Sequence, residues 1–157
     1  MADVVSIETG SGAAEPRISY AVARLERAVR AAIAERVRPH GLTTLQYTTL
    51  SVLERHGAPL SNAQLARRAY MSPQSMSEVI DALEQKGLIR RNPHPNHGRQ
   101  LPATLTAKGR RVLVDCERMV DELEGVMLAD LTARQQTAFR EALKSAVRAL
   151  AAGFPHD

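Results

Sequence analysis

The sequence predicts a mainly α-helical protein with a small β-wing, in which a winged helix-turn-helix lies between N- and C-terminal dimerisation helices. Only 3% of the 157 residues are aromatic and Trp is absent, which favours helices packed through aliphatic side chains. Apolar residues recur at helical spacing along most of the chain. Between residues 72 and 105 the pattern changes to helix, short strand, polar loop and short strand.

Composition and charge narrow the functional class. The formal net charge is +4 and the isoelectric point is about 9.7, which suggests a polyanionic partner. The single Cys excludes an intramolecular disulfide framework and suits a reducing cytoplasm. The N-terminus has neither a basic start nor a long apolar run, and no stretch has membrane-spanning length. We therefore expect a cytoplasmic protein without a membrane partner.

The N-terminal part is expected to contain a tail and one dimerisation helix. Residues 1–16 are rich in Gly, Ser and Ala and predict a disordered tail. Residues 17–42 form the N-terminal dimerisation part, with a helix from about Arg17 to Arg38 that Pro39 and Gly41 end. The apolar stripe of this helix supplies three predicted interface residues, Ile18, Val22 and Leu25.

The next two helices are predicted by the same sequence pattern at their N-termini. Thr43 is followed three residues later by Gln46, and Ser61 is followed three residues later by Gln64. A Ser or Thr followed at this spacing by Gln is typical of a capping box at a helix N-terminus. The second of these helices ends near Arg68 or Ala69, and a brief turn leads to the next helix.

The helix that begins after Ser72 is the predicted reading helix. Ser72 is the expected N-cap, Pro73 suits the first helical position, and Gly87 suits the stop. Its apolar stripe consists of Met76, Val79, Ile80 and Leu83. Strands are expected over Leu88–Arg91 and Leu101–Leu105, separated by the loop Asn92–Gln100. Residues 43–105 thus form the predicted DNA-binding part.

Residues 106–157 are predicted to form a C-terminal dimerisation part with two helices. The first begins at Leu105 or Thr106 and runs to about Ala129, and the second follows a capping box at Thr132 and Gln135. The second helix carries the predicted interface residues Phe139, Leu143, Val147 and Leu150. A lobe of this size cannot cover such wide apolar faces, so we expect a homodimer. The alternative is that these helices fold back on their own lobe.

Candidate DNA contacts gather at the start of the reading helix and around the wing. Small hydrogen-bonding side chains at a helix N-terminus suit base edges and phosphates, and clustered arginines suit phosphates. The first group is Ser61, Ser72, Gln74, Ser75 and Ser77, and the second is Arg67, Arg68, Arg90, Arg91, His97 and Arg99. Glu78, Asp81 and Glu84 would repel phosphate later in the same helix. The alternative is that all these side chains are ordinary solvated residues.

Several stretches together resemble the MarR family of bacterial transcription regulators. They are MSPQSMSEVIDALEQKGLIRR from Met71, LTAKG from Leu105 and LTARQ from Leu131. The resemblance covers about Ile18 to Gly153 and implies a homodimer that binds a pseudo-palindromic site in double-stranded DNA, usually as a repressor. It also implies release by a small aromatic or anionic effector bound between the dimerisation and DNA-binding parts.

The resemblance is weaker at the wing and leaves the effector site open. The family often has an Asp-Arg-Arg cluster where this chain has His97, Gly98 and Arg99, so only the final Arg matches. The junction of the first two helices, where the family binds effectors, contains His40, Gln46 and Tyr47. Core or capping roles explain those three residues equally well.

No enzyme, metal or cofactor chemistry is predicted. The five His residues are scattered, and no nucleophile with a base and no Gly-rich phosphate loop is present. His94 and His97 have the spacing of a metal pair, but no Cys accompanies them in the Pro-rich loop. Cys116 lies on an apolar stripe, which indicates a core residue rather than a redox sensor. The alternative functions are a constitutive or redox-responsive regulator and a winged helix that binds only proteins.

Overall fold

The computed structural model describes residues 15–92 and 101–150, and within these ranges the chain forms six α-helices, one 3-10 helix and a two-stranded sheet. The predicted class, mainly α-helical with a small β-wing, is confirmed. Of the predicted tail only residues 15 and 16 are described. In chain order the elements are α1 (Ile18–Val37), η1 (Arg38–His40), α2 (Thr44–His56), α3 (Asn62–Arg68), α4 (Pro73–Gln85), β1 (Ile89–Arg91), β2 (Ala103–Leu105), α5 (Ala107–Met127) and α6 (Ala133–Ala149).

Side-chain caps begin five of the six helices. The capping boxes predicted at Thr43, Ser61 and Thr132 are all present, with the hydroxyl and the Gln side chain each bonded to the other residue's backbone N–H. Ser72 and Thr106 cap α4 and α5 through their hydroxyls alone. Each such cap is worth about 1 kcal/mol, so local sequence sets where these helices begin.

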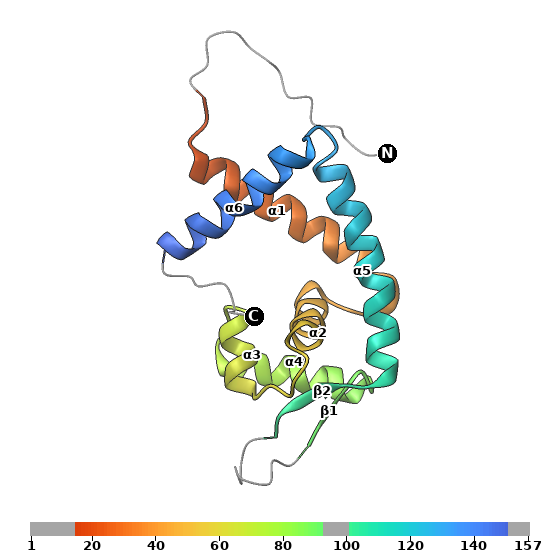
Figure 1. The fold of residues 1–157 in the computed structure, drawn as a ribbon. Helices are drawn as coiled ribbons and strands as arrows, with labels where there is room; N and C mark the ends of the chain where they lie inside the picture. Colours follow the sequence, from red (N-terminus) through yellow and green to blue (C-terminus); the bar gives the residue numbers. More distant parts are fainter. Residues whose placement is uncertain (1–14, 93–100, 151–157) are drawn as a thin grey trace.

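The core lies in the lobe formed by α2, α3, α4 and the two strands, with α5 along one side (Figure 1). The predicted stripe of α4 faces this core, with Met76, Ile80 and Leu83 buried and Val79 partly buried. Elements outside the lobe also contribute to it. Val37 enters from the end of α1, and Leu113, Cys116 and Val120 enter from α5.

The two strands are shorter than predicted and a third segment joins them. Ile89 pairs with Leu105 and Arg91 pairs with Ala103 in antiparallel register. Leu88 is not part of the strand because its N–H donates to the carbonyl of Leu83 at 3.0 Å and so completes the end of α4. Ala103 also exchanges hydrogen bonds of 2.8 and 3.2 Å with Leu60, which connects the sheet to the chain between α2 and α3.

Gly109 permits a close contact between α5 and the wing. A Cβ atom on Gly109 would lie 2.0 Å from the carbonyl oxygen of Leu88, far inside van der Waals contact. The Thr106 hydroxyl donates to the carbonyls of Gly87 at 2.7 Å and Leu88 at 3.1 Å at the same joint. The first turn of α5 is therefore fixed directly against the start of β1.

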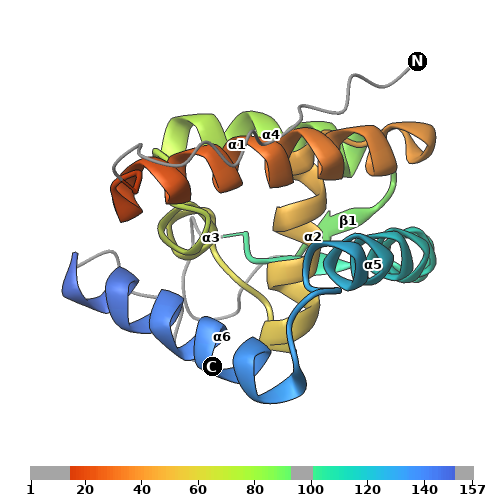
Figure 2. The same cartoon turned by 90° about the horizontal axis from the view of Figure 1, so that it is seen from above.

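The helices α1 and α6 expose most of their surface. Val37 is the only buried residue of α1, and α6 has none. Both helices lie at the same end of the molecule in Figure 1, but the view from above places them on different sides (Figure 2). No helix among the described residues is long and apolar enough to cross a membrane.

Candidate nucleic-acid interface

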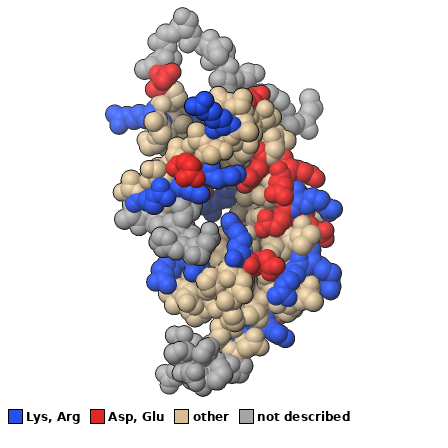
Figure 3. All heavy atoms as spheres, in the orientation of Figure 1, with Lys and Arg blue, Asp and Glu red and all other residues tan. Residues whose placement is uncertain are grey.

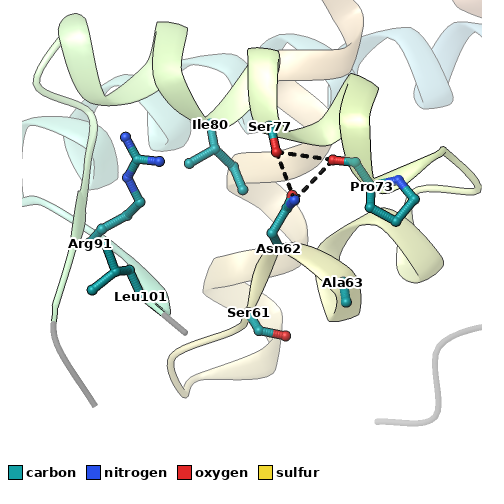
Figure 4. A pocket seen from close by; sticks show the side chains of 8 residues that line it. All are labelled: Ser61, Asn62, Ala63, Pro73, Ser77, Ile80, Arg91 and Leu101. Carbon is teal, nitrogen blue, oxygen red and sulfur yellow. Dashed lines mark hydrogen bonds between the residues drawn. The ribbon is translucent and has the colours of Figure 1, made fainter. Parts of the chain in front are cut away.

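The joint between α3 and α4 is held by side-chain hydrogen bonds as well as by the turn. The Met71 N–H donates to the carbonyl of Ala66 at 2.8 Å. The Asn62 amide on α3 donates to the carbonyl of Pro73 at 2.9 Å and to the Ser77 hydroxyl at 2.8 Å (Figure 4). These bonds fix the first turn of α4 against α3, as the predicted helix-turn-helix requires.

The first turn of α4 presents exposed polar side chains. The Ser72 hydroxyl accepts the Ser75 N–H at 3.1 Å and donates to the Ser75 hydroxyl at 2.9 Å. Gln74 and Ser75 are exposed, as the predicted role of reading DNA requires. The positive end of the helix dipole lies at the same place, so this turn favours an anionic partner.

Ser77 differs from the other predicted contacts in this helix. Its hydroxyl donates to the carbonyl of Pro73 at 3.1 Å and accepts from Asn62, and the residue is half-buried. The donor and one of the two acceptor positions of the hydroxyl are thus used inside the protein. We assign Ser77 to the packing of α3 against α4, and Asn62 is the partner that sequence reasoning missed.

Tyr70 is a second residue that sequence reasoning missed. Its φ of 56° makes it the only described residue other than glycine in the left-handed region. A side chain larger than Gly or Asn is disfavoured in this region. The ring is 58% exposed beside the start of α4. A strained and exposed aromatic residue next to a recognition turn is a candidate contact, and no sequence signal announces its backbone conformation.

Four further predicted DNA contacts lie on or next to α3 and on β1. The hydroxyl of Ser61 is used as the N-cap of α3, where it accepts the Gln64 N–H at 3.3 Å. Arg67 is exposed and Arg68 is half-buried in the last turn of α3. Arg90 is exposed on β1. Among these four residues, Arg67 and Arg90 are the most accessible to a phosphate.

Arg91 is held by two carboxylates of α4. Its Nη2 lies 2.9 Å from Asp81 Oδ1 and also contacts Glu84 Oε2, while its Nε donates to the same Glu84 oxygen at 2.8 Å. The predicted role of Arg91 as a phosphate contact therefore competes with two internal ion pairs. The remaining predicted wing residues, His97 and Arg99, lie outside the described residues, as does His94.

A groove separates α4 from the wing. It has a volume of about 320 Å³, and Arg91 and Leu101 face Ser77 and Ile80 across it (Figure 4). The Asn62 Oδ1 atom at this groove is buried and has no hydrogen-bond partner among the described residues.

A larger cavity of about 590 Å³ lies between α2 and α5. Tyr47 lines its inner end, where burial and the neighbouring Glu117 carboxylate, to which the phenol is hydrogen-bonded, raise the pKa of Tyr47 well above its ordinary value. The Ser51 hydroxyl donates to Glu117 at 2.8 Å. Arg55 and Arg110 line the cavity as well, and acidic side chains gather over α5 on the face that Figure 3 shows.

Of the three predicted effector residues, one lines this cavity. Tyr47 lines the cavity, whereas Gln46 is buried and His40 is half-buried in η1. Gln46 Oε1 accepts from the Thr43 N–H at 3.2 Å and from Lys86 Nζ at 2.8 Å, and Lys86 also donates to the carbonyl of Gly41. Gln46 thus has the capping role, and Lys86 ties the end of α4 to the corner between α1 and α2.

The predicted interface residues all lie on accessible faces of α1 and α6. Ile18 is 82% exposed and Leu150 is 81% exposed. Val22 is also exposed, and the other four are half-buried: Leu25, Phe139, Leu143 and Val147. Apolar side chains that stay accessible along two helices are typical of a protein–protein interface.

Comparisons with known proteins agree with this architecture. A family model described as the MarR family matches residues 40–100. The HTH-type transcriptional repressor Rv2887 of Mycobacterium tuberculosis (strain ATCC 25618 / H37Rv) is 36% identical over 127 residues, which cover 81% of this chain and 91% of that protein.

Two solved structures of the Mycobacterium tuberculosis MarR family protein Rv2887 have a similar fold. The complex with DNA has a TM-score of 0.70 and 34% identity, and the match covers 84% of this chain and 98% of the other. The complex with p-aminosalicylic acid has a TM-score of 0.67 and 35% identity over 83% of this chain and 98% of the other. The chain described here belongs to the MarR family of winged helix-turn-helix transcription regulators.

Proposed function

We propose that this protein is a homodimeric transcriptional repressor that binds a pseudo-palindromic DNA site through the first turn of α4. The observation that carries the proposal is the N-terminal turn of α4, with Gln74 and Ser75 exposed and Arg90 accessible on the adjacent wing strand. The repressor name of the relative and the DNA complex of the similar structure support it. A DNA-binding regulator acts where the chromosome is, so we place it in the cytoplasm.

Gln74 offers a direct test of this reading surface. An amide can pair with adenine in the major groove through one donor and one acceptor. Gln74→Ala should therefore cost about 1–3 kcal/mol at the preferred base and relax specificity there. The measurement is binding to fragments selected from random DNA, with each base substituted in turn.

Gln85→Ala is the matched control, because Gln85 is an exposed amide at the opposite end of the same helix. It should change affinity by less than about 0.5 kcal/mol. Equal losses for the two variants at every base would show that Gln74 does not read DNA.

The proposed dimer contacts and the proposed DNA contacts lie in different parts of the chain. Residues 17–42 and 106–157 supply the dimer contacts, and residues 43–105 supply the DNA contacts. The reading part shares its core with Val37, Leu113 and Cys116, which come from the dimerisation helices. A change in how two protomers pack can therefore reach the reading helix through continuous side-chain contacts.

We further propose that a small aromatic or anionic effector binds in the cavity between α2 and α5. Its 590 Å³ lie within the range typical of small-molecule sites, and its lining includes the Tyr47 phenol and three arginines, Arg55, Arg110 and Arg118, alongside four carboxylates. Support comes from the p-aminosalicylic acid complex of the similar structure. Val114 lines this cavity and is 67% exposed, so a larger side chain there can fill the cavity without overpacking the core.

The effector site is tested by titrating the DNA complex with salicylate, p-aminosalicylate and benzylamine. The two acids should release DNA from the unmodified protein, and the cationic amine should not. Val114→Trp should weaken the response to both acids at least about tenfold, while Val114→Ala should leave it within about threefold. An unchanged response in Val114→Trp would place the effector elsewhere.

A further inference from the structure

Helix α4 is negatively charged, although the DNA that it is proposed to read is negatively charged as well. Helix α4 contains Glu78, Asp81 and Glu84 and no Lys or Arg. These three side chains are three residues apart, so they share one side of the helix. Double-stranded DNA carries about one negative charge per 1.7 Å of its axis, and an uncompensated carboxylate close to it is repelled.

Arg91 compensates two of these three carboxylates from the wing. Its guanidinium points from β1 toward α4 (Figure 4) and pairs with Asp81 and Glu84. Glu84 also accepts the backbone N–H of Arg91 at 3.2 Å through its other oxygen. A single carboxylate thus fixes both the side chain and the main chain of the strand.

The pKa shifts of Glu84 and Arg91 have the directions expected for an ion pair between the two side chains. Hydrogen bonds from the Arg91 guanidinium hold the pKa of Glu84 below its ordinary value, and the same contact raises the pKa of Arg91. The side chains of Arg91, Asp81 and Glu84 keep 32%, 52% and 36% of their surface exposed, so the charges of this cluster lie at the protein surface.

We propose that Arg91 supports DNA binding without contacting DNA, because it neutralises the acidic side of α4. Arg91 then acts through these two carboxylates, and Arg90 is the phosphate contact of the strand. The inference rests on the DNA-binding function proposed above. It predicts that replacing Arg91 no longer weakens DNA binding once Asp81 and Glu84 are replaced by neutral residues.

The test measures fluorescence anisotropy of a fragment selected from random DNA, over a series of salt concentrations. The full-length variants are Arg91→Gln, the pair Asp81→Asn with Glu84→Gln, and all three changes together. Arg91→Gln should weaken binding about tenfold or more. The triple variant should return to within about threefold of the unmodified protein, with the same salt slope.

Arg90→Gln is the matched control on the neighbouring residue of the same strand. It should weaken binding and reduce the salt slope by about one, and adding the neutral pair should not restore it to the unmodified level. The neutral pair alone should bind at least as tightly as the unmodified protein. Circular dichroism melting of each variant separates loss of binding from loss of folding.

Two results would overturn the role of Arg91. One is a triple variant as weak as Arg91→Gln with a salt slope lower by about one, which would make Arg91 a phosphate contact. The other is weaker binding by the neutral pair at an unchanged melting temperature, and this result decides even where Arg91→Gln does not fold. An unmodified protein that binds no DNA would overturn the proposed function itself and this inference with it.

Discussion

Gly109 controls how closely α5 can approach the wing. An alanine there would place its Cβ 2.0 Å from the Leu88 carbonyl oxygen, which is backbone and cannot rotate away. We expect Gly109→Ala to lower the free energy of unfolding by about 1–3 kcal/mol or more, since α5 or β1 must shift. Urea unfolding followed by circular dichroism measures this change.

Gly125 supplies the control for that experiment within the same helix. A Cβ there meets nothing within 4 Å. Gly125→Ala should therefore stabilise the protein by about 0.5–1 kcal/mol through helix propensity. Equal effects of the two alanines would contradict the proposed close contact at Gly109.

Cys116 is fully buried and its thiol should be inert at neutral pH. Burial, with smaller effects from Asp115 and Glu117, raises the pKa of Cys116 from 9.0 to about 11. Because the pKa is higher in the folded state, the stabilisation by the neutral thiol is complete below pH 9 and is lost as the pH rises through about 11. Alkylation by iodoacetamide should be slow at pH 7.5 and accelerate only in that alkaline range.

The same burial predicts the response to oxidants. DNA binding by the unmodified protein and by Cys116→Ser should be equally insensitive to mild peroxide, because the reactive thiolate is scarce. Release of DNA by peroxide in the unmodified protein alone would establish Cys116 as a sensor.

At the scale of whole elements, Lys86 connects the end of α4 to the corner between α1 and α2. Its ammonium donates to the Gly41 carbonyl and to Gln46 Oε1, the oxygen that also completes the cap of α2. Lys86→Met should cost about 1–3 kcal/mol of stability, because a buried amide and a carbonyl lose a charged donor. It should also broaden the half-site spacings recovered from random DNA, because the end of α4 is no longer fixed.

Lys108→Met is the comparison for Lys86. Lys108 Nζ donates to the carbonyl of Lys86 at 2.8 Å from an exposed position, so its loss should cost less than about 1 kcal/mol and leave spacing unchanged. A Lys86→Met protein that keeps a single preferred spacing would rule out this positioning role.

The elements were predictable from the sequence to a greater degree than the site. Helix starts depend on residues within three positions of one another, and all three predicted capping boxes are present. Residue type and position in the sequence alone predict that Ser77 and Arg91 contact DNA. Their actual partners, Asn62 on α3 and the carboxylates on α4, become neighbours only when the chain folds.

The predicted dimer interface illustrates the same limit over a longer range. Helical spacing correctly identified an apolar stripe on α1 and α6, because spacing along one helix is local information. Whether that stripe meets its own lobe or a second copy depends on where α5 directs α6, which no local pattern encodes. In the structure α6 has no buried residue, so the described part of the protomer does not cover it.

For the molecule as a whole, the exposed faces of α1 and α6 predict that the dimer can be broken by one charge. Val147→Asp should convert the protein to a monomer in sedimentation and weaken binding to a two-half-site fragment far more than to a single half-site. Ser145→Asp places the same charge on an exposed residue of the same helix and should leave the dimer intact. A dimeric Val147→Asp protein would exclude this face of α6 from the interface.

With no buried residue in α6, the proposed pairing of two copies would make folding of this helix depend on the concentration of the protein. A helix stabilised only by a second copy gains order by mass action, so the melting temperature should rise with protein concentration. When the cell contains few copies, binding to the operator is lost more steeply than the number of molecules falls, because both the pairing and the order of the helices decline. The rate at which the protein is synthesised would then determine whether repression occurs, even when no effector is present.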